Sequence, residues 1–292
     1  MVARPTLPEA LRRSLAGWTR PPAIGGNGLV ALGAASVDAW LGGGIPRAAL
    51  HEVFAERTAD VAAATGFALA IALRSGAPAA GTLTGKGEGG RPILWVRQDF
   101  AEVEAGGVHP PGLAELGLDP GRILLVRARD GAAVLRAAAE GARCPALAAV
   151  LIQPWGEPRL LDLTATRRLS LAAAGSGVLT VLLRAAATPA PSAAATRWAV
   201  LPLPSHAGEG DAAEWANAPG RPAFAIRLLR HRGGVAEGEW RVEWNRDQGC
   251  FEDGTAPDAR RDRPAPLPRP VVPLLLDRPA AAGKAGRLRR AG

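Results

Sequence analysis

Short apolar runs alternate with helically spaced segments over residues 49–184. Runs 123–126 and 150–152 contain no polar residue, as strands buried on both faces of a sheet require. Since such strands alternate with helices, this half is predicted to be α/β, with a mostly parallel sheet flanked by helices. The predicted strands are 49–54, 92–97, 122–127, 146–153 and 177–184, and the predicted helices are 60–74, 131–143, 162–174 and one ending near residue 116.

After residue 184 the pattern changes to strands with no helices between them. Apolar side chains occupy alternate positions in 224–228 and again in 240–244, the period of a strand with one buried face. The Gly-rich segment between these runs predicts a hairpin. Strands at 196–203, 223–230 and 239–245 are therefore predicted to extend the sheet in antiparallel fashion.

The first 22 residues have the spacing of a short amphipathic helix. Leu7, Leu11, Leu15 and Trp18 recur every three or four residues, and prolines at 21 and 22 end the pattern. Such a helix either packs on its own domain or docks on a partner, and the sequence leaves both alternatives open.

The charge is unevenly distributed along the chain. The formal net charge of the 292 residues is +8, but residues 257–292 hold nine basic side chains against three acidic ones. The rest of the chain is close to neutral, so the charge alone does not indicate a nucleic-acid-binding body. We therefore expect an N-terminal helix at 1–22, a core domain at 23–250, and a Pro- and Arg-rich disordered tail at 251–292.

Cysteine usage and hydropathy indicate a cytoplasmic protein that does not associate with membranes. Cys144 and Cys250 are far apart and belong to no zinc-binding pattern, which fits a reducing compartment. The longest uncharged apolar stretch, 61–73, is shorter than the roughly 18 residues that a membrane span requires. Acidic and basic residues near the N-terminus exclude a secretory signal there.

Two glycine motifs resemble functional signatures only in their letters. Residues 85–90 match GxGxxG but precede a predicted strand, so no helix N-terminus follows to bind a pyrophosphate. Residues 175–177 read Gly-Ser-Gly, which is not a nucleophile elbow and predicts a helix C-cap. The four histidines are scattered and form no zinc or catalytic pattern.

Segment 36–53 carries the most specific pattern of the chain. An Asp-x-x-Leu helix end leads to Gly-Gly-Gly-Ile-Pro-Arg and then to a strand containing Glu-Val. This order resembles the approach to the nucleotide site in RecA-like recombinase cores. The resemblance implies that a phosphate-binding loop, GxxxxGK[ST], should follow the strand.

The residues that follow the strand do not form such a loop. They are Ala55, Glu56, Arg57, Thr58, Ala59 and Asp60. This stretch has no glycine, its two carboxylates would repel phosphate, and neither of the two lysines of the chain is near it in sequence.

Two further positions of a RecA-like ATPase also differ. By the resemblance, the position of the Mg²⁺-binding Asp is occupied by Gln153, and that of the catalytic Glu falls at Gln98 or Asp99. We therefore expect a degenerate ATPase site, no enzymatic activity, no cofactor and no metal.

The broken loop and five further segments together resemble the ImuA family of inducible mutagenesis proteins. The five segments are 116–122, 125–129, 161–169, 193–198 and 228–234. The resemblance implies a non-catalytic accessory factor of damage-induced (SOS) error-prone translesion DNA synthesis. It also implies a complex with ImuB and an error-prone DNA polymerase, and contact with RecA.

Two sets of residues are candidates for these contacts. Leu11, Leu15 and Trp18 form the apolar face that would dock on ImuB or RecA. Arg167 and Arg168 share a predicted helix, and Arg230 and Arg232 bracket the predicted hairpin turn. These four arginines either contact DNA or are simply solvated.

Two other functions remain as alternatives. One is an active RecA-like ATPase in DNA repair, which the missing glycine and lysine oppose. The other is a regulatory inhibitor of cell division in the DNA-damage response, since chains of that kind resemble this one. The sequence does not distinguish which surface meets which partner.

Overall fold

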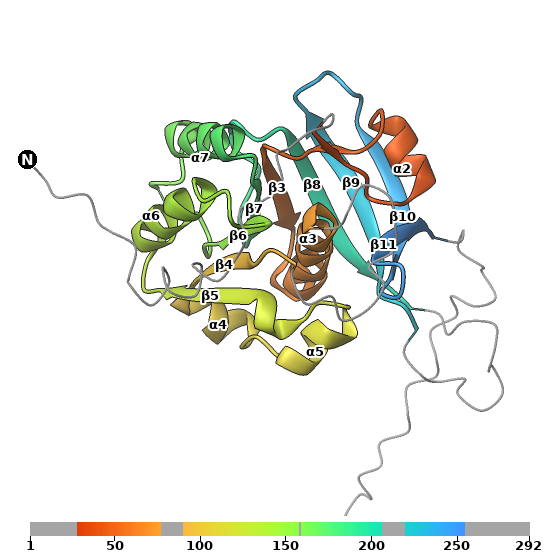
Figure 1. Cartoon of the computed structure of the whole chain (residues 1–292), viewed down its shortest axis with the longest axis horizontal. Helices are drawn as coiled ribbons and strands as arrows, with labels where there is room; N and C mark the ends of the chain where they lie inside the picture. The colour runs from red at the N-terminus through yellow and green to blue at the C-terminus, as the bar shows by residue number, and fades with distance from the viewer. Residues whose placement is uncertain (1–27, 77–89, 158, 206–219, 255–292) are drawn as a thin grey trace, which may run out of the picture. The chain divides into compact units, whose positions relative to one another are not determined.

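The computed structural model describes residues 28–76, 90–157, 159–205 and 220–254. Within these residues the chain forms a nine-stranded sheet with the order β11-β10-β9-β8-β3-β7-β6-β4-β5 (Figure 1). The parallel strands are β3 (Leu50–Ala55), β4 (Ile93–Gln98), β5 (Ile123–Ala128), β6 (Ala149–Gln153), β7 (Leu179–Ala185) and β8 (Thr196–Leu203). The antiparallel strands are β9 (Ala223–His231), β10 (Gly238–Asn245) and β11 (Cys250–Asp253).

Helices cover both faces of this sheet. The helices are α2 (Ala35–Trp40), α3 (Val61–Gly76), α4 (Asp99–Ala105), α5 (Pro110–Glu115), α6 (Gly131–Ala142) and α7 (Leu163–Ser176), with 3-10 turns η1 (Thr58–Asp60) and η2 (Pro120–Arg122). α3 packs on one face, against β3, β6, β7 and β8, while α6 and α7 pack together on the other face. The predicted α/β architecture with an antiparallel extension is therefore confirmed.

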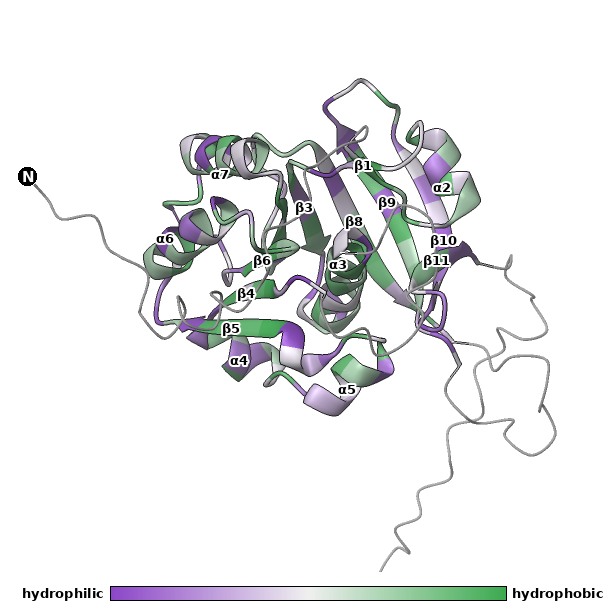
Figure 2. Cartoon of the chain, viewed as in Figure 1, coloured by the Kyte–Doolittle hydropathy of each residue, from purple (hydrophilic) through white to green (hydrophobic). Residues whose placement is uncertain are grey.

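The core has one apolar layer on each side of the sheet. On the α3 side, Phe67 contacts the rings of Trp198, Phe224 and Phe251, with ring centroids 5.2–6.2 Å apart. These four aromatic side chains are almost fully buried, and burial of apolar surface is the main source of folding free energy. Figure 2 shows the parallel strands β3, β4, β5 and β6 coloured mainly as hydrophobic.

The structure corrects three details of the predicted elements. β8 runs parallel to β3, so the antiparallel part begins one strand later than predicted. β7 and β8 both pair in parallel with β3, so the segment between them returns the chain to the end of the sheet where β7 starts. Parallel strands require such a crossover connection. The helix predicted before residue 116 is two short helices, because Pro110 and Pro111 fit only the first turn of a new helix. β11 also extends the core beyond the predicted boundary at residue 250.

The glycine triplet at 42–44 turns the chain back before β3. All three residues have positive φ, and a Cβ on Gly44 would lie 2.2 Å from the carbonyl oxygen of Val30. Only glycine fits at this position, where β2 (Ile45–Pro46) pairs with β1 (Leu29–Val30). The triplet therefore serves as a close turn that sets the entry of β3 into the sheet.

No helix in the described parts of the chain is long and apolar enough to cross a membrane.

His51 is fully buried in β3 within a chain of hydrogen bonds. Its Nε2 lies 2.8 Å from the carbonyl oxygen of Pro46, which can only accept, so Nε2 carries the proton and Nδ1 accepts from Thr196 Oγ1 at 2.7 Å. Trp198 Nε1 in turn donates to Thr196 Oγ1 at 2.8 Å. Burial lowers the pKa of His51 to about 4, because the charged imidazolium would lose its solvation.

We predict a measurable pH dependence of stability from His51. The folded-state pKa lies below the ordinary value of 6.5, so the unfolded state binds a proton that the folded state does not. Stability is then complete above about pH 6.5 and falls toward pH 4, by up to about 1.4 kcal/mol per pH unit. Urea unfolding of the wild type and of His51→Gln across this range measures the two slopes. The slope should be shallower in the variant, and equal slopes would contradict the assignment.

Candidate functional site

The segment after β3 is short and makes its own ion pairs. Glu56 and Arg57 connect β3 to η1, and α3 begins immediately afterwards at Val61. The Glu56 carboxylate lies 2.8 Å from Arg227 Nη2 of β9. In the structure, residues 55–60 comprise the end of β3, Glu56 and Arg57, and the 3-10 turn η1.

Asp60 brings a carboxylate to the start of α3. Its side chain is 1% exposed and accepts from Arg57 Nε and Nη2, both at 2.9 Å, while the Arg57 side chain is 71% exposed. The hydrogen bonds from Arg57 keep the pKa of Asp60 below its ordinary value. A carboxylate is favoured at the positive end of a helix, where a phosphate would otherwise be stabilised.

The side chains at the ends of β4 and β6 are engaged within the protein. Gln153 Oε1 accepts from Trp95 Nε1 at 3.1 Å and from Arg97 Nε at 3.0 Å. Gln98 Oε1 accepts from the backbone N–H of Trp155 at 3.0 Å. Both glutamines are therefore used to join neighbouring strand ends.

Asp99 is the other residue predicted at the catalytic Glu position. It lies at the start of α4, about half exposed, with Oδ1 3.6 Å from Arg127 Nε. Among the described residues there is no group of three His, Cys, Asp or Glu side chains that could hold a metal ion. Lys86, Lys284 and most of the 85–90 motif lie outside the described residues.

The structure describes only some of the candidate contact residues. Leu11, Leu15 and Trp18 lie outside the described residues. Arg167 and Arg168 are exposed on α7, and Arg230 and Arg232 are exposed at the β9–β10 hairpin, whose position is as predicted.

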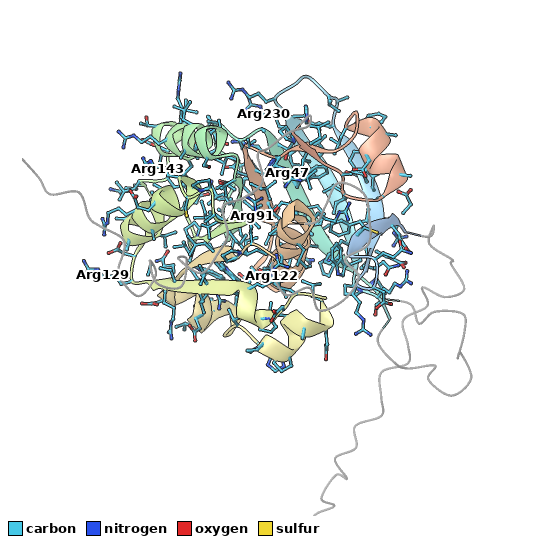
Figure 3. The ribbon with its side chains drawn as sticks, viewed as in Figure 1. Arg47, Arg91, Arg122, Arg129, Arg143 and Arg230 are labelled. Atoms are coloured by element: carbon cyan, nitrogen blue, oxygen red, sulfur yellow. The ribbon has the colours of Figure 1, made fainter. Side chains whose placement is uncertain are left out.

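Segment 192–193 connects the elements that carry the two arginine pairs. Arg230 Nη1 donates to the carbonyl oxygen of Ser192 at 3.2 Å, and Ala193 N donates to Thr166 Oγ1 of α7 at 3.2 Å. Figure 3 shows Arg230 in this region, beside the hairpin. At the other end of α7, Gly177 has a left-handed conformation and caps the helix, as predicted for the Gly-Ser-Gly sequence.

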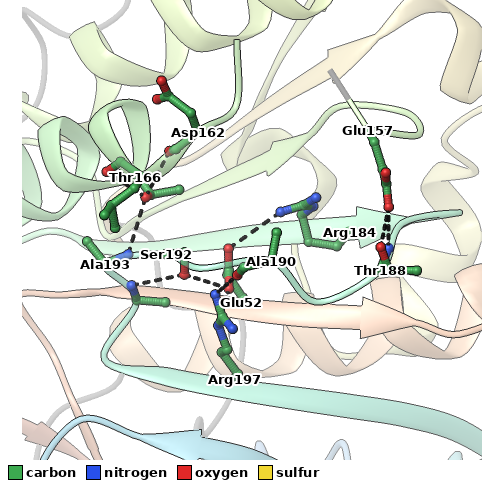
Figure 4. A network of polar contacts seen from close by, with 12 residues as sticks. Glu52, Glu157, Asp162, Thr166, Arg184, Thr188, Ala190, Ser192, Ala193 and Arg197 are labelled. Atoms are coloured by element: carbon green, nitrogen blue, oxygen red, sulfur yellow. Dashed lines mark hydrogen bonds and ion pairs between the residues drawn. The ribbon is translucent and has the colours of Figure 1, made fainter. Parts of the chain in front are cut away.

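A buried charge cluster lies on the central strand, and sequence reasoning missed it. Glu52 of β3 is fully buried between Arg184 of β7 and Arg197 of β8, at 3.6 Å from Arg184 Nη1 and 2.7 Å from Arg197 Nε (Figure 4). Ser192 Oγ donates to Glu52 Oε2 at 2.8 Å. Burial lowers the pKa of Arg184, and the charge of Glu52 partly opposes this effect.

The cluster fixes the segment between β7 and β8. Arg197 Nη2 donates to the carbonyl oxygen of Ala190, which binds that segment to β8. Ala193 N donates to Thr166 Oγ1, which binds the same segment to α7. Glu157 accepts from the backbone and hydroxyl of Thr188, which joins the segment after β6 to the same region. The signal in the sequence was the presence of single charged residues within otherwise apolar strands.

These features define an α/β protein with an open, mostly parallel sheet. The carboxylate of Asp60 lies at the start of α3, the helix that follows the central strand β3. No family model matches the chain. Two relatives named Protein ImuA, from the NA1000 / CB15N and ATCC 19089 / CIP 103742 / CB 15 strains of Caulobacter vibrioides, are each 30% identical over 270 residues. The match covers 89% of this chain and 95% of each relative. The chain belongs to the ImuA family.

A solved structure gives a weaker likeness. The crystal structure of the RadB recombinase matches 78% of this chain and 100% of its own, with a TM-score of 0.49 and 16% sequence identity. The α/β assignment follows from the strand order described above.

We predict that the Glu52 carboxylate is essential for stability. Glu52→Ala leaves two buried guanidinium groups without their anion, and losses of about 3–5 kcal/mol are typical for a broken buried pair. Glu140→Ala removes an exposed carboxylate 3.0 Å from Arg143 and should cost less than about 1 kcal/mol.

Denaturant unfolding of both variants measures the difference. Glu52→Gln keeps the size of the side chain and removes only its charge. The free energy of unfolding of this variant should therefore lie between those of Glu52→Ala and the wild type. Equal stabilities of Glu52→Ala and Glu140→Ala would show that the cluster is not needed.

Proposed function

We propose that this protein is a non-catalytic accessory factor of damage-induced error-prone translesion DNA synthesis that acts by binding ImuB and RecA. Membership of the ImuA family supports the biological role. The proposal that the protein is non-catalytic depends on one observation, the buried Asp60 carboxylate at the start of α3.

The closed turn after β3 opposes nucleotide binding in two ways. A nucleotide phosphate placed at the N-terminus of α3 would meet the Asp60 carboxylate, whose charge is maintained by Arg57. The turn also presents no glycine whose backbone could form a nest of N–H donors. Expelling Asp60 would break both of its hydrogen bonds to Arg57, a cost that the ligand would have to meet.

Protein binding remains the activity that this architecture supports. The sheet and α3 enclose a continuous apolar core, and the buried Glu52 cluster links three of the strands. Residues 1–22 carry the predicted amphipathic helix, whose face of Leu11, Leu15 and Trp18 would supply the contact with ImuB or RecA. The protein would then associate with an error-prone polymerase by binding ImuB.

We predict that ATP with Mg²⁺ does not stabilise the protein. A ligand at 100 times its Kd would add about 2.7 kcal/mol to the free energy of unfolding. Thermal unfolding with and without millimolar ATP and Mg²⁺, together with a phosphate-release assay, measures binding and turnover. Unchanged unfolding and no turnover are expected, whereas stabilisation with turnover would establish the active-ATPase alternative.

We predict that removal of residues 1–20 abolishes the binding of ImuB or of RecA but not folding. Pull-downs of purified ImuB and of RecA by the full-length and shortened proteins measure the effect, and circular dichroism checks the fold. The triple variant Leu11→Ser, Leu15→Ser, Trp18→Ser should reproduce the loss with the chain length kept.

Unchanged capture of both partners by the folded, shortened protein would refute this assignment. Co-purification with the cell-division GTPase in place of ImuB would establish the division-inhibitor alternative.

A further inference from the structure

A hollow of about 480 Å³ lies between the ends of α6 and α7, on the face of the sheet opposite to α3. The two helix ends are held together by Ser176 Oγ, which donates to the carbonyl oxygen of Ala142 at 2.5 Å. Figure 3 labels Arg143 in the region where the two helices lie side by side. The hollow is lined by Arg143, Arg168, Leu171, Ala172, Gly175 and Ser176.

The surface around this hollow is both basic and apolar. Leu163 and Leu171 of α7 are 53% and 64% exposed, and Arg167 lies midway between them at the four-residue spacing of one helix face. α7 contains no acidic residue. Exposed leucines gathered on one helix face are typical of a surface that binds another protein.

The two arginines of the hollow differ in how well they are neutralised. Arg143 Nη1 lies 3.0 Å from Glu140 Oε1. Arg168, in contrast, forms no ion pair with any carboxylate in the part of the chain that the structure describes. An occupant with a carboxylate would complement this guanidinium.

Part of the lining of the hollow allows another chain to approach closely. Three of the lining residues, Ala172, Gly175 and Ser176, are small. A Cβ built on Gly175 meets no atom within 4 Å, so the space above it is open. A leucine-sized side chain of a partner can therefore enter beside Leu171 while an acidic neighbour reaches Arg168.

We propose that the α6–α7 hollow binds an acidic, leucine-bearing helical segment of a partner protein. Charge complementarity excludes the tail of this chain as the occupant, because residues 257–292 are strongly basic. DNA would pair with the arginines but offers no apolar group that would cover both leucines. The proposal extends the proposed function by assigning a second surface, separate from residues 1–22, to protein binding.

The test uses full-length protein and a fluorescent designed peptide of about 18 residues, or five helical turns, with leucines every four residues and glutamates beside them. One control peptide replaces the leucines by serine, and another replaces the glutamates by lysine. Gly175→Leu adds an apolar side chain to the lining of the hollow at a position where a Cβ meets no atom within 4 Å, and Arg168→Glu reverses the charge there. Ala174→Leu and Arg246→Glu are matched controls at exposed positions that do not line the hollow.

The leucine–glutamate peptide should bind the wild type, and Gly175→Leu and Arg168→Glu should each weaken it by roughly tenfold or more. The two control variants should bind like the wild type, and neither control peptide should bind. Failure of the first peptide to bind, or equal binding to all variants, would overturn the proposal.

A labelled single-stranded oligonucleotide tests DNA as the occupant. Binding that is lost in Arg168→Glu but retained in Gly175→Leu would assign the arginines to DNA and overturn the proposal. Because these assays contain neither ImuB nor RecA, their failure is distinguishable from a failure of the proposed function.

Discussion

The whole described fold depends on a charge buried at the centre of its sheet. Glu52 lies on β3, which is the strand between β7 and β8, and its carboxylate meets one arginine from each neighbour. A single buried carboxylate would be very costly, and so would either guanidinium alone. The pairing therefore makes the positions of the three strands interdependent, and Ser192 and Ala190 add the crossing segment to the same unit.

The same strand determines what the carboxyl edge of the sheet can do. β3 passes directly into the turn of Glu56 and Arg57, and Asp60 then occupies the start of α3. In this arrangement the protein supplies its own anion at the place where a helix N-terminus would attract one. Gln98 and Gln153 similarly join neighbouring strand ends. The protein's own side chains therefore occupy this edge of the sheet at Asp60, Gln98 and Gln153.

Much of the fold was predictable because its elements have clear periodicities. The apolar runs of β5 and β6 and the alternating pattern of the β9–β10 hairpin identified strands within a few residues of their bounds. The direction of β8 was not predictable, since it depends on which strand lies between β7 and β8. The sequence shows that residues 55–60 lack glycine and carry two carboxylates, but it does not show that Asp60 pairs with Arg57. The Glu52 cluster and the α6–α7 hollow join residues far apart in sequence, which no local pattern reveals.

The proposed function has two parts: the protein acts by binding partners, and nucleotide has no part in that binding. The most direct test is a calorimetric titration of full-length protein with purified ImuB, performed with and without ATP and Mg²⁺. If the proposed function is correct, the two proteins bind and the Kd is the same in both conditions. An absence of binding, or a Kd that changes when ATP and Mg²⁺ are added, would contradict it.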